Sequence, residues 1–168
     1  MPVEPLPDLP PHSFVFLDSN VLIYGLTGVS GQCADLLDRC QREELTGLTL
    51  YETINETTHR LMVAEAKSKG VSASGGARAL GRSFRLIPTL RDYWHDTVRL
   101  LDMNLLIVPV SENILRSAQT ERQAAGLLTN DSMIASCMRE YGISFLATND
   151  SDFERVAGIT LFKPGDLL

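Results

Sequence analysis

Short runs of apolar residues alternate along the chain with longer segments in which apolar residues recur at helical spacing. The apolar runs are Ser13–Asp18, Leu48–Tyr51, Leu105–Ser111, Ile143–Thr148 and Gly158–Pro164. Because successive positions in these runs are apolar, they are typical of strands that are buried on both faces of a parallel sheet. The second run is brief, so we predict a sheet of four to five strands.

The segments between these runs are expected to be helices. The first follows Asp18 directly, and the others cover Gly31–Gly47, Tyr51–Gly70, Thr89–Met103, Glu112–Gly126 and Ser132–Gly142. We expect Ser19 or Asn20 to cap the first helix. Gly47 is expected to end the second helix, and Ser111 to cap the fifth. Strands that alternate with helices predict an α/β fold with right-handed crossovers around a parallel sheet.

The chain is predicted to form one domain, residues 13–168, after a flexible Pro-rich tail, residues 1–12. Its 168 residues suit one domain, and a hydrophobic content of 44% is sufficient for a core. The tail lacks the basic and apolar regions of a secretory signal. No apolar run reaches the roughly 18 residues that span a membrane, and the cysteines form no disulfide or zinc pattern. We therefore expect a cytoplasmic protein.

Charge is distributed unevenly along this acidic chain, whose formal net charge is −6. The segment from Lys67 to Arg99 has seven basic and two acidic residues, and the remainder has eight basic and nineteen acidic residues. A local basic patch can attract nucleic acid even when the whole protein is acidic. A solvated surface or the acidic segment of a partner protein would explain the same pattern.

Acidic residues follow two of the predicted strands. Asp18 ends the first apolar run, and Asp150 follows Ile143–Thr148, with Asp152 two residues later. In parallel α/β folds, ligands bind outside the carboxyl ends of the strands, so these side chains are expected to face one crevice. Two further acids lie near the starts of predicted helices: Glu56 in "INET" and Asp131 in "TNDSMIA".

Carboxylates crowded at one site repel one another, and a divalent cation removes that cost. Oxygen ligands without nearby Cys or His favour Mg²⁺ or Mn²⁺ over zinc. Magnesium prefers a substrate phosphate as a further ligand, so such a cluster indicates phosphoryl chemistry. The structural alternative is that each acid acts alone, with Asp131 as an ordinary helix N-cap.

The motifs "FVFLDSNVLIY", "NET", "TNDSMIA" and "FLATNDSDF" resemble, in this order, those of the PIN-domain ribonucleases, especially the VapC-like toxins of toxin–antitoxin systems. The resemblance extends from about Phe14 to Pro164. It implies a three-layer α/β/α fold with a central parallel sheet. It also implies a magnesium-dependent endoribonuclease, with Mn²⁺ as an alternative ion.

The resemblance places the family's acids on residues of this chain. They would be Asp18, Glu56, Asp131 and Asp150 as catalytic residues and metal ligands, with Asp152 as a further ligand. Family members differ in which acid of the last motif approaches the metal, so Asp150 and Asp152 both stay open. Ser19, Asn20 and Thr148 match the family's small polar positions, which orient carboxylates and waters.

The resemblance also implies how the protein acts. Water would hydrolyse an RNA phosphodiester and leave 5′-phosphate and 3′-hydroxyl ends. The implied partners are RNA, a cognate antitoxin and a second copy of the chain in a homodimer, without a membrane. In the basic segment we expect contacts with RNA phosphates, and the candidates are Arg78, Arg82, Arg85 and Arg91.

Three other classes of protein are alternatives, and the first two need residues that this chain lacks at the expected positions. A haloacid-dehalogenase-type phosphatase needs a second Asp two residues after the first, where this chain has Asn20. A phospho-receiver domain needs an early acidic pair and a lysine after a late strand, and Lys163 lies beside Pro164 near the chain's end. A PIN-like scaffold that binds RNA or protein without cutting is the main non-enzyme alternative.

Overall fold

The computed structural model describes residues 2–70, 81 and 84–167. Six strands are present in this part of the chain, and all their pairings are parallel. They are β1 (Val3–Pro5), β2 (Phe14–Leu17), β3 (Thr46–Leu50), β4 (Leu105–Val108), β5 (Phe145–Ala147) and β6 (Thr160–Lys163). The order across the sheet is β1-β6-β5-β2-β3-β4. The predicted parallel α/β fold is confirmed, whereas the predicted number of strands was too low.

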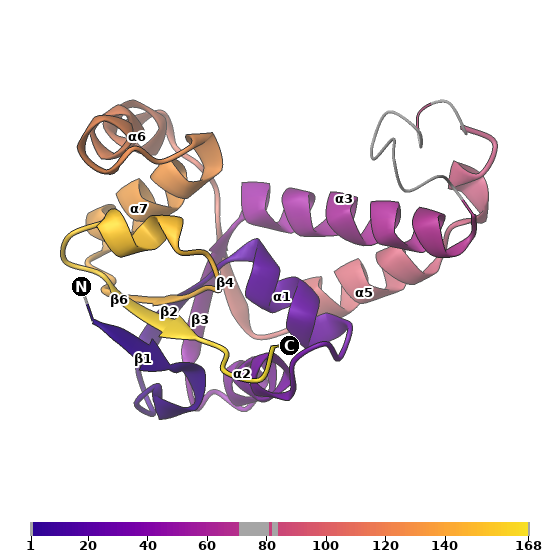
Figure 1. Ribbon diagram of the computed structural model, residues 1–168, viewed down its shortest axis with the longest axis horizontal. Coiled ribbons are helices and arrows are strands. Elements are labelled where there is room, and N and C mark those ends of the chain that lie inside the picture. The colour runs from indigo at the N-terminus through magenta and orange to yellow at the C-terminus, as the bar shows by residue number, and fades with distance from the viewer. Residues whose placement is uncertain (1, 71–80, 82–83, 168) are drawn as a thin grey trace.

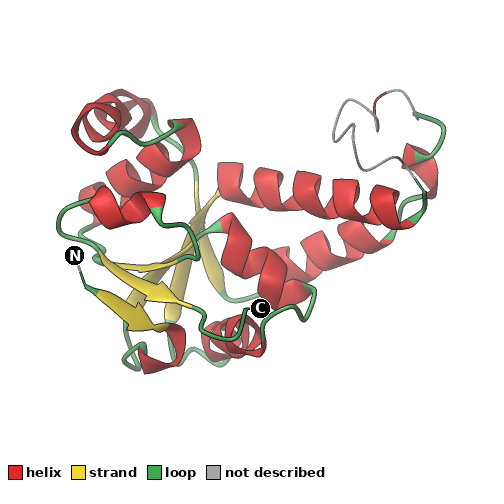
Figure 2. Cartoon of the chain, viewed as in Figure 1, coloured by secondary structure: helices red, strands yellow, loops and turns green. Residues whose placement is uncertain are grey.

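Helices cover both faces of this sheet (Figures 1 and 2). The α-helices are α1 (Ser19–Leu26), α2 (Gly31–Gln41), α3 (Tyr51–Ser68), α5 (Asp92–Leu101), α6 (Glu112–Ala125) and α7 (Thr129–Tyr141). Short 3₁₀ helices are η1 (Leu6–Asp8), η3 (Ile87–Thr89) and η4 (Asp152–Arg155). Helices α3 and α5 lie side by side and project beyond the sheet as a pair, which we call the α3–α5 arm.

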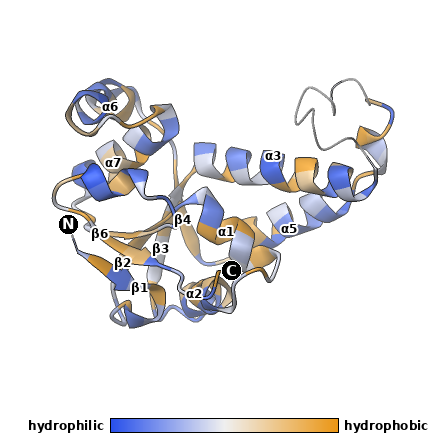
Figure 3. Ribbon diagram, viewed as in Figure 1, coloured by the Kyte–Doolittle hydropathy of each residue, from blue (hydrophilic) through white to orange (hydrophobic). Residues whose placement is uncertain are grey.

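Two hydrophobic cores lie on opposite faces of the sheet, and the strands between them are largely hydrophobic (Figure 3). One core joins α6 and α7 to the face that carries Phe16 and Leu146. The other joins α1, α2 and parts of the arm to the face that carries Val15 and Leu17. Neighbouring residues of β2 thus enter different cores, which explains why its sequence is apolar at successive positions.

The strand order reverses beside β2. From β2 the chain moves outward through β3 to β4, and it then returns to place β5 on the other side of β2. Such a switch point opens a crevice at the carboxyl ends of the two central strands. Asp18 follows β2 and Thr148 follows β5, so the fold brings these two residues to that crevice.

The first twelve residues differ from the predicted flexible tail. Val3–Pro5 pairs with β6 as an edge strand, and Leu6 and Leu9 are buried in the core. Proline is tolerated in an edge strand because that strand needs few ladder hydrogen bonds. The prolines led to the prediction of a tail, although Leu6 and Leu9 supply the apolar contacts that attach this segment.

Helix boundaries near the site also differ from the predictions. Asp18, rather than Ser19 or Asn20, is the N-cap of α1 and accepts the Ser19 amide hydrogen. Helix α2 ends at Gln41, and Gly47 lies in β3, where a Cβ would approach Leu105 Cδ2 to 2.7 Å. Gly47 therefore serves close packing rather than helix termination.

Helix α7 begins three residues earlier than predicted, at Thr129, and its N-cap is Leu128. Asp131 therefore lies in the first helical turn and is not the N-cap, so the structural alternative for this residue is wrong. The predicted cap of α6 is confirmed, because Ser111 accepts the Ile114 amide hydrogen. Within the described ranges, no helix combines the length and apolar character needed to cross a bilayer.

Truncation of Leu6 tests whether the first residues belong to the folded domain. We expect Leu6→Ala to lower the free energy of unfolding by roughly 2–4 kcal/mol, because it leaves a cavity in the core. Urea denaturation monitored by circular dichroism measures this change. Val3→Ala is the matched control, since Val3 is 46% exposed whereas Leu6 is 1% exposed. Equal, small effects of both substitutions would contradict the structural role of this segment.

Candidate active site

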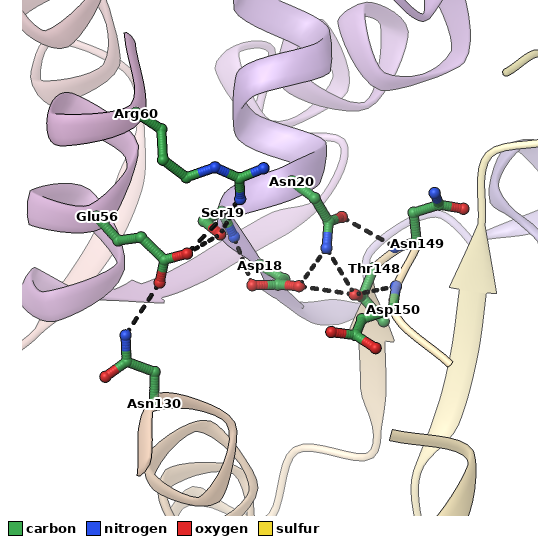
Figure 4. A network of polar contacts seen from close by, with 9 residues as sticks. All are labelled: Asp18, Ser19, Asn20, Glu56, Arg60, Asn130, Thr148, Asn149 and Asp150. Atoms are coloured by element: carbon green, nitrogen blue, oxygen red, sulfur yellow. Dashed lines mark hydrogen bonds and ion pairs between the residues drawn. The ribbon is translucent and has the colours of Figure 1, made fainter. Parts of the chain in front are cut away.

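Asp18 lies at the carboxyl end of β2, buried at the switch point of the sheet (Figure 4). Its Oδ1 accepts a hydrogen bond of 2.6 Å from the Ser19 amide. Its Oδ2 accepts one from Asn20 Nδ2 and one of 2.7 Å from Thr148 Oγ1. These donors fix the carboxylate in one orientation and partly offset its burial.

Thr148 joins the two central strands through its hydroxyl group. The single hydroxyl hydrogen is donated to Asp18, and the oxygen accepts from Asn20 Nδ2 at 3.1 Å and from the Asp150 amide at 2.9 Å. One donor and two acceptor positions are thus all used. Asn20 Oδ1 accepts from the Asn149 amide at 2.9 Å, which attaches α1 to the loop after β5.

Glu56 extends from the second turn of α3 toward α1 and α7 (Figure 4). Its Oε1 accepts from Ser19 Oγ at 3.1 Å, and its Oε2 accepts from Asn130 Nδ2 at 3.0 Å. Arg60, one turn further along α3, lies 3.6 Å from Oε1 and donates to Ser19 Oγ at 3.2 Å. Three helices therefore meet around this carboxylate.

The remaining acids come from the first turn of α7 and from the segment after β5. Asp131, Asp150 and Asp152 each offer a carboxylate oxygen, and these oxygens lie within 4.8 Å of one another. Asp150 Oδ1 accepts the Asp152 amide hydrogen at 2.8 Å, so the loop itself holds the two acids close. Asp152 has a second partner, because Arg155 lies 3.2 Å from its Oδ1.

Electrostatic repulsion links all five acids. The pKa of Asp131 is raised to about 6, most of all by burial and then, in decreasing order, by the charges of Asp18, Asp150, Glu56 and Asp152. Burial likewise raises the pKa of Asp18, against the hydrogen bonds from Thr148 and Ser19. Asp131 thus lies at the electrostatic centre of the cluster, and acids in such surroundings are typical of functional sites.

The donor set fits a hard divalent cation. The side chains gathered at the switch point offer carboxylate oxygens, and the described residues place no Cys or His among them. Mg²⁺ and Mn²⁺ prefer oxygen ligands and tolerate a partly hydrated site. The oxygens of Asp131, Asp150 and Asp152 are close enough together to share one ion, and the charges of Asp18 and Glu56 act on Asp131 at the same place.

Two of the four predicted phosphate contacts can be placed, and neither lies at this cluster. Arg78 and Arg82 lie outside the described residues. Arg85 is exposed, and the Arg91 amide donates to Glu65 near the far end of α3. Nine residues separate Glu56 from Glu65, which is about 14 Å along a helix axis. A phosphate role for Arg85 and Arg91 stays a prediction.

Two residues of the site were missed in the sequence analysis. Arg60 lies four residues after Glu56, and that spacing places both side chains on one face of a helix. Asn130 directly precedes Asp131, but its contact with Glu56 depends on how α7 packs against α3. The contact between Arg60 and Glu56 could therefore be predicted from their spacing, whereas the contact between Asn130 and Glu56 required the tertiary structure.

The sequence is similar to proteins of known family. The PIN domain family model matches residues 15–159. Ribonuclease VapC2 of Methanocaldococcus jannaschii is 26% identical over 150 residues, which cover 84% of this chain and 88% of that protein. Residues 15–159, which match the family model, include every acid of the cluster, from Asp18 to Asp152.

Solved structures share the fold at lower sequence identity. VapBC2 from Rickettsia felis, solved with a DNA fragment from its promoter, aligns with a TM-score of 0.54 and 19% identity, over 89% of this chain and 98% of that chain. VapC20 of Mycobacterium tuberculosis, described as a sarcin-ricin-loop-cleaving toxin, aligns with a TM-score of 0.56 and 15% identity, over 86% and 96%.

Without metal, the acid cluster should make the stability of the protein depend on pH. A carboxyl group with a raised pKa binds its proton more tightly in the folded state. The stability that Asp131 contributes is therefore fully present below its unfolded pKa of 3.8 and is lost as the pH rises through its folded pKa of about 6. We expect Asp131→Asn to raise the free energy of unfolding at pH 7 by roughly 1–2 kcal/mol.

Urea denaturation in EDTA at several pH values measures this effect. Asp35→Asn, on the exposed side of α2, is the matched control and should leave the stability nearly unchanged. A metal-free wild-type protein whose stability rises between pH 4 and 6 more steeply than that of Asp131→Asn would contradict the assigned repulsion.

Proposed function

The chain belongs to the PIN-domain family, and from this premise we propose that it is a metal-dependent endoribonuclease that hydrolyses RNA phosphodiester bonds. The observation that carries the proposal is the position of Asp131. It faces four other acids at the switch point of the sheet, and burial together with their repulsion raises its pKa to about 6. Such crowding destabilises the free protein and is compensated when a divalent cation binds.

The side chains of the site would have different roles in hydrolysis. A bound Mg²⁺ or Mn²⁺ supplies a water of lowered pKa and offsets charge on the phosphate oxygens. Asp18, Asp131 and Asp150 would hold that ion, with Asp152 as a further ligand, and Thr148 keeps Asp18 in position through a hydrogen bond of 2.7 Å. The attacking water forms a bond to phosphorus and gives up a proton while the bond to the 3′ oxygen breaks. The 3′ oxygen takes up a proton, which leaves 5′-phosphate and 3′-hydroxyl ends.

Of the two acids in the last motif, we assign the closer role to Asp150. Its charge raises the pKa of both Asp18 and Asp131, whereas the charge of Asp152 is the smallest of the four that raise the pKa of Asp131. Asp152 also pairs with Arg155 and has a side chain that is 42% exposed. A carboxylate that already has a cationic partner has less to gain from a metal ion.

The relatives support a toxin role with a protein partner. One similar structure is the VapBC2 complex, and one is described as a toxin that cleaves the sarcin-ricin loop. We extend this to the present chain as the toxin of a toxin–antitoxin pair, with RNA as substrate and a cognate antitoxin as inhibitor. A homodimer is part of the same proposal.

The alternative of a catalytically silent PIN-like scaffold is less well supported, because the full set of acids is present and mutually oriented. A phospho-receiver function is disfavoured for a separate reason. Lys163 pairs with Glu154 at 2.6 Å on β6 rather than with the acids of the cluster.

Neutralising Asp18 or Asp131 tests the proposed activity. We expect Asp18→Asn and Asp131→Asn each to lower metal-dependent RNA cleavage at least a hundredfold, because each removes charge that holds the ion. Asparagine remains an acceptable N-cap at position 18, so the fold should survive. The measurement is cleavage of a labelled single-stranded RNA with Mg²⁺, with Mn²⁺ and with EDTA.

Asp35→Asn is the control for this experiment and should retain wild-type cleavage. Circular dichroism and a thermal shift with Mn²⁺ accompany each variant, and the shift should disappear in Asp131→Asn. Full activity of both neutralised variants would overturn the proposed site. A wild-type protein that binds Mn²⁺ and RNA without cleavage would favour the scaffold.

Separate substitutions of Asp150 and Asp152 test their order of importance. We expect Asp150→Asn to weaken Mn²⁺ binding about tenfold more than Asp152→Asn, because Asp150 is coupled to both Asp18 and Asp131. Isothermal titration with Mn²⁺ measures both affinities. A larger loss in Asp152→Asn would reverse the assignment.

A further inference from the structure

We propose that Arg60, together with a hollow on the same face of α3, binds the RNA backbone beside the acid cluster. This inference rests on the proposed ribonuclease function and adds to it the path of the substrate. The hollow has a volume of about 310 Å³ and is lined by His59, Arg60, Val63, Ala64 and Lys67.

Arg60 lies beside Glu56 and Ser19 of the cluster (Figure 4), and it also lines the hollow. It is one helical turn from Glu56, about 6 Å along the axis. Its guanidinium touches Ser19 Oγ at 3.2 Å and approaches Glu56 at 3.6 Å. The same residue therefore borders the reaction site and the hollow along the arm.

The ion pair of Arg60 with Glu56 is weak enough for Arg60 to bind a substrate phosphate. Its side chain is 46% exposed, and an exposed ion pair at 3.6 Å is weak. Glu56 retains two neutral donors, Ser19 and Asn130, when Arg60 turns away. A phosphate can thus take the guanidinium without leaving the Glu56 carboxylate unpaired.

A polyanion needs such a cation at this point. The protein has a formal net charge of −6, and five carboxylates converge at the switch point. RNA phosphates entering this field are repelled unless positive side chains adjoin their path. Arg60 and Lys67 lie on one face of α3 two turns apart, so they provide two positive charges that lead away from the acids.

The chemistry of the hollow fits single-stranded backbone. Val63 and Ala64 provide a small apolar floor between the cations, which suits a sugar or a base edge. A guanidinium binds phosphate with two parallel hydrogen bonds, so Arg60 suits the phosphate nearest the cleaved bond. Such contacts position a strand without reading its sequence.

The test compares Arg60→Gln, Lys67→Gln and Arg60→Lys with the control Arg116→Gln. Arg116 also pairs with a Glu four residues earlier, but it lies on α6. Binding of a short labelled single-stranded RNA is measured by fluorescence anisotropy over a range of NaCl concentrations, in EDTA. Steady-state cleavage and Mn²⁺ titration are measured on the same proteins.

We expect Arg60→Gln to raise Kd and KM about five- to tenfold, with kcat within about threefold. The slope of log affinity against log salt should decrease by about 0.7 for each lost phosphate contact. Lys67→Gln should give the same slope change with a smaller loss of affinity, and Arg60→Lys should restore the slope. Arg116→Gln should match wild type.

Two results would overturn the inference. One is that Arg60→Gln and Lys67→Gln both leave the RNA affinity and the salt slope unchanged. This face of α3 would then bind another partner, such as an acidic protein segment. The other is weakened Mn²⁺ binding in Arg60→Gln with an unchanged salt slope, which would mean that Arg60 only holds Glu56 in position. If the wild-type protein does not cut RNA, the proposed function fails. The salt dependence of RNA binding then still shows whether Arg60 contacts phosphate.

Discussion

The parallel pairing of β2 with β5 is the contact on which the site depends. These strands are separated by more than a hundred residues, yet Leu17 pairs with Ala147 and the Asp18 amide donates to the Ala147 carbonyl at 3.1 Å. The hydrogen bond from Thr148 to Asp18 extends that ladder by one side chain. Because the order of strands reverses there, no crossover helix blocks the carboxyl end, and acids from several elements can meet.

This arrangement places stability and function in conflict. Burial and mutual repulsion disfavour the charged forms of Asp18 and Asp131, yet metal binding requires those forms. Neutral donors limit the conflict without cancelling the charge. Thr148 and Asn20 orient Asp18, and the loop after β5 uses its own amides to hold Asp150. A set of cationic partners would have stabilised the free protein more and would have competed with a metal ion.

The sequence predicted the features that depend on local patterns and on strand ends. Buried parallel strands have apolar residues at successive positions, and an acid after such a strand must lie at the sheet edge, so Asp18 and Asp150 could be placed together. The first residues were misjudged because their prolines resemble a tail, whereas the burial of Leu6 depends on β6, which lies at the other end of the chain. The contact of Asn130 with Glu56 could not be predicted, because it depends on how two helices approach each other.

The repeated tripeptide Thr-Asn-Asp illustrates how the backbone decides what a motif does. In the first turn of α7, Asn130 extends to Glu56 while Asp131 faces the other acids. After β5, the Thr148 hydroxyl and the backbone amides of Asn149 and Asp150 hold the segment, while the Asp150 carboxylate lies with the other acids. Equal residues thus act through different atoms, since helical spacing separates neighbouring side chains by about 100° whereas a strand end turns them to opposite faces. The first copy binds the cluster to the α3–α5 arm, and the second binds it to the sheet, so the acids are held from both sides.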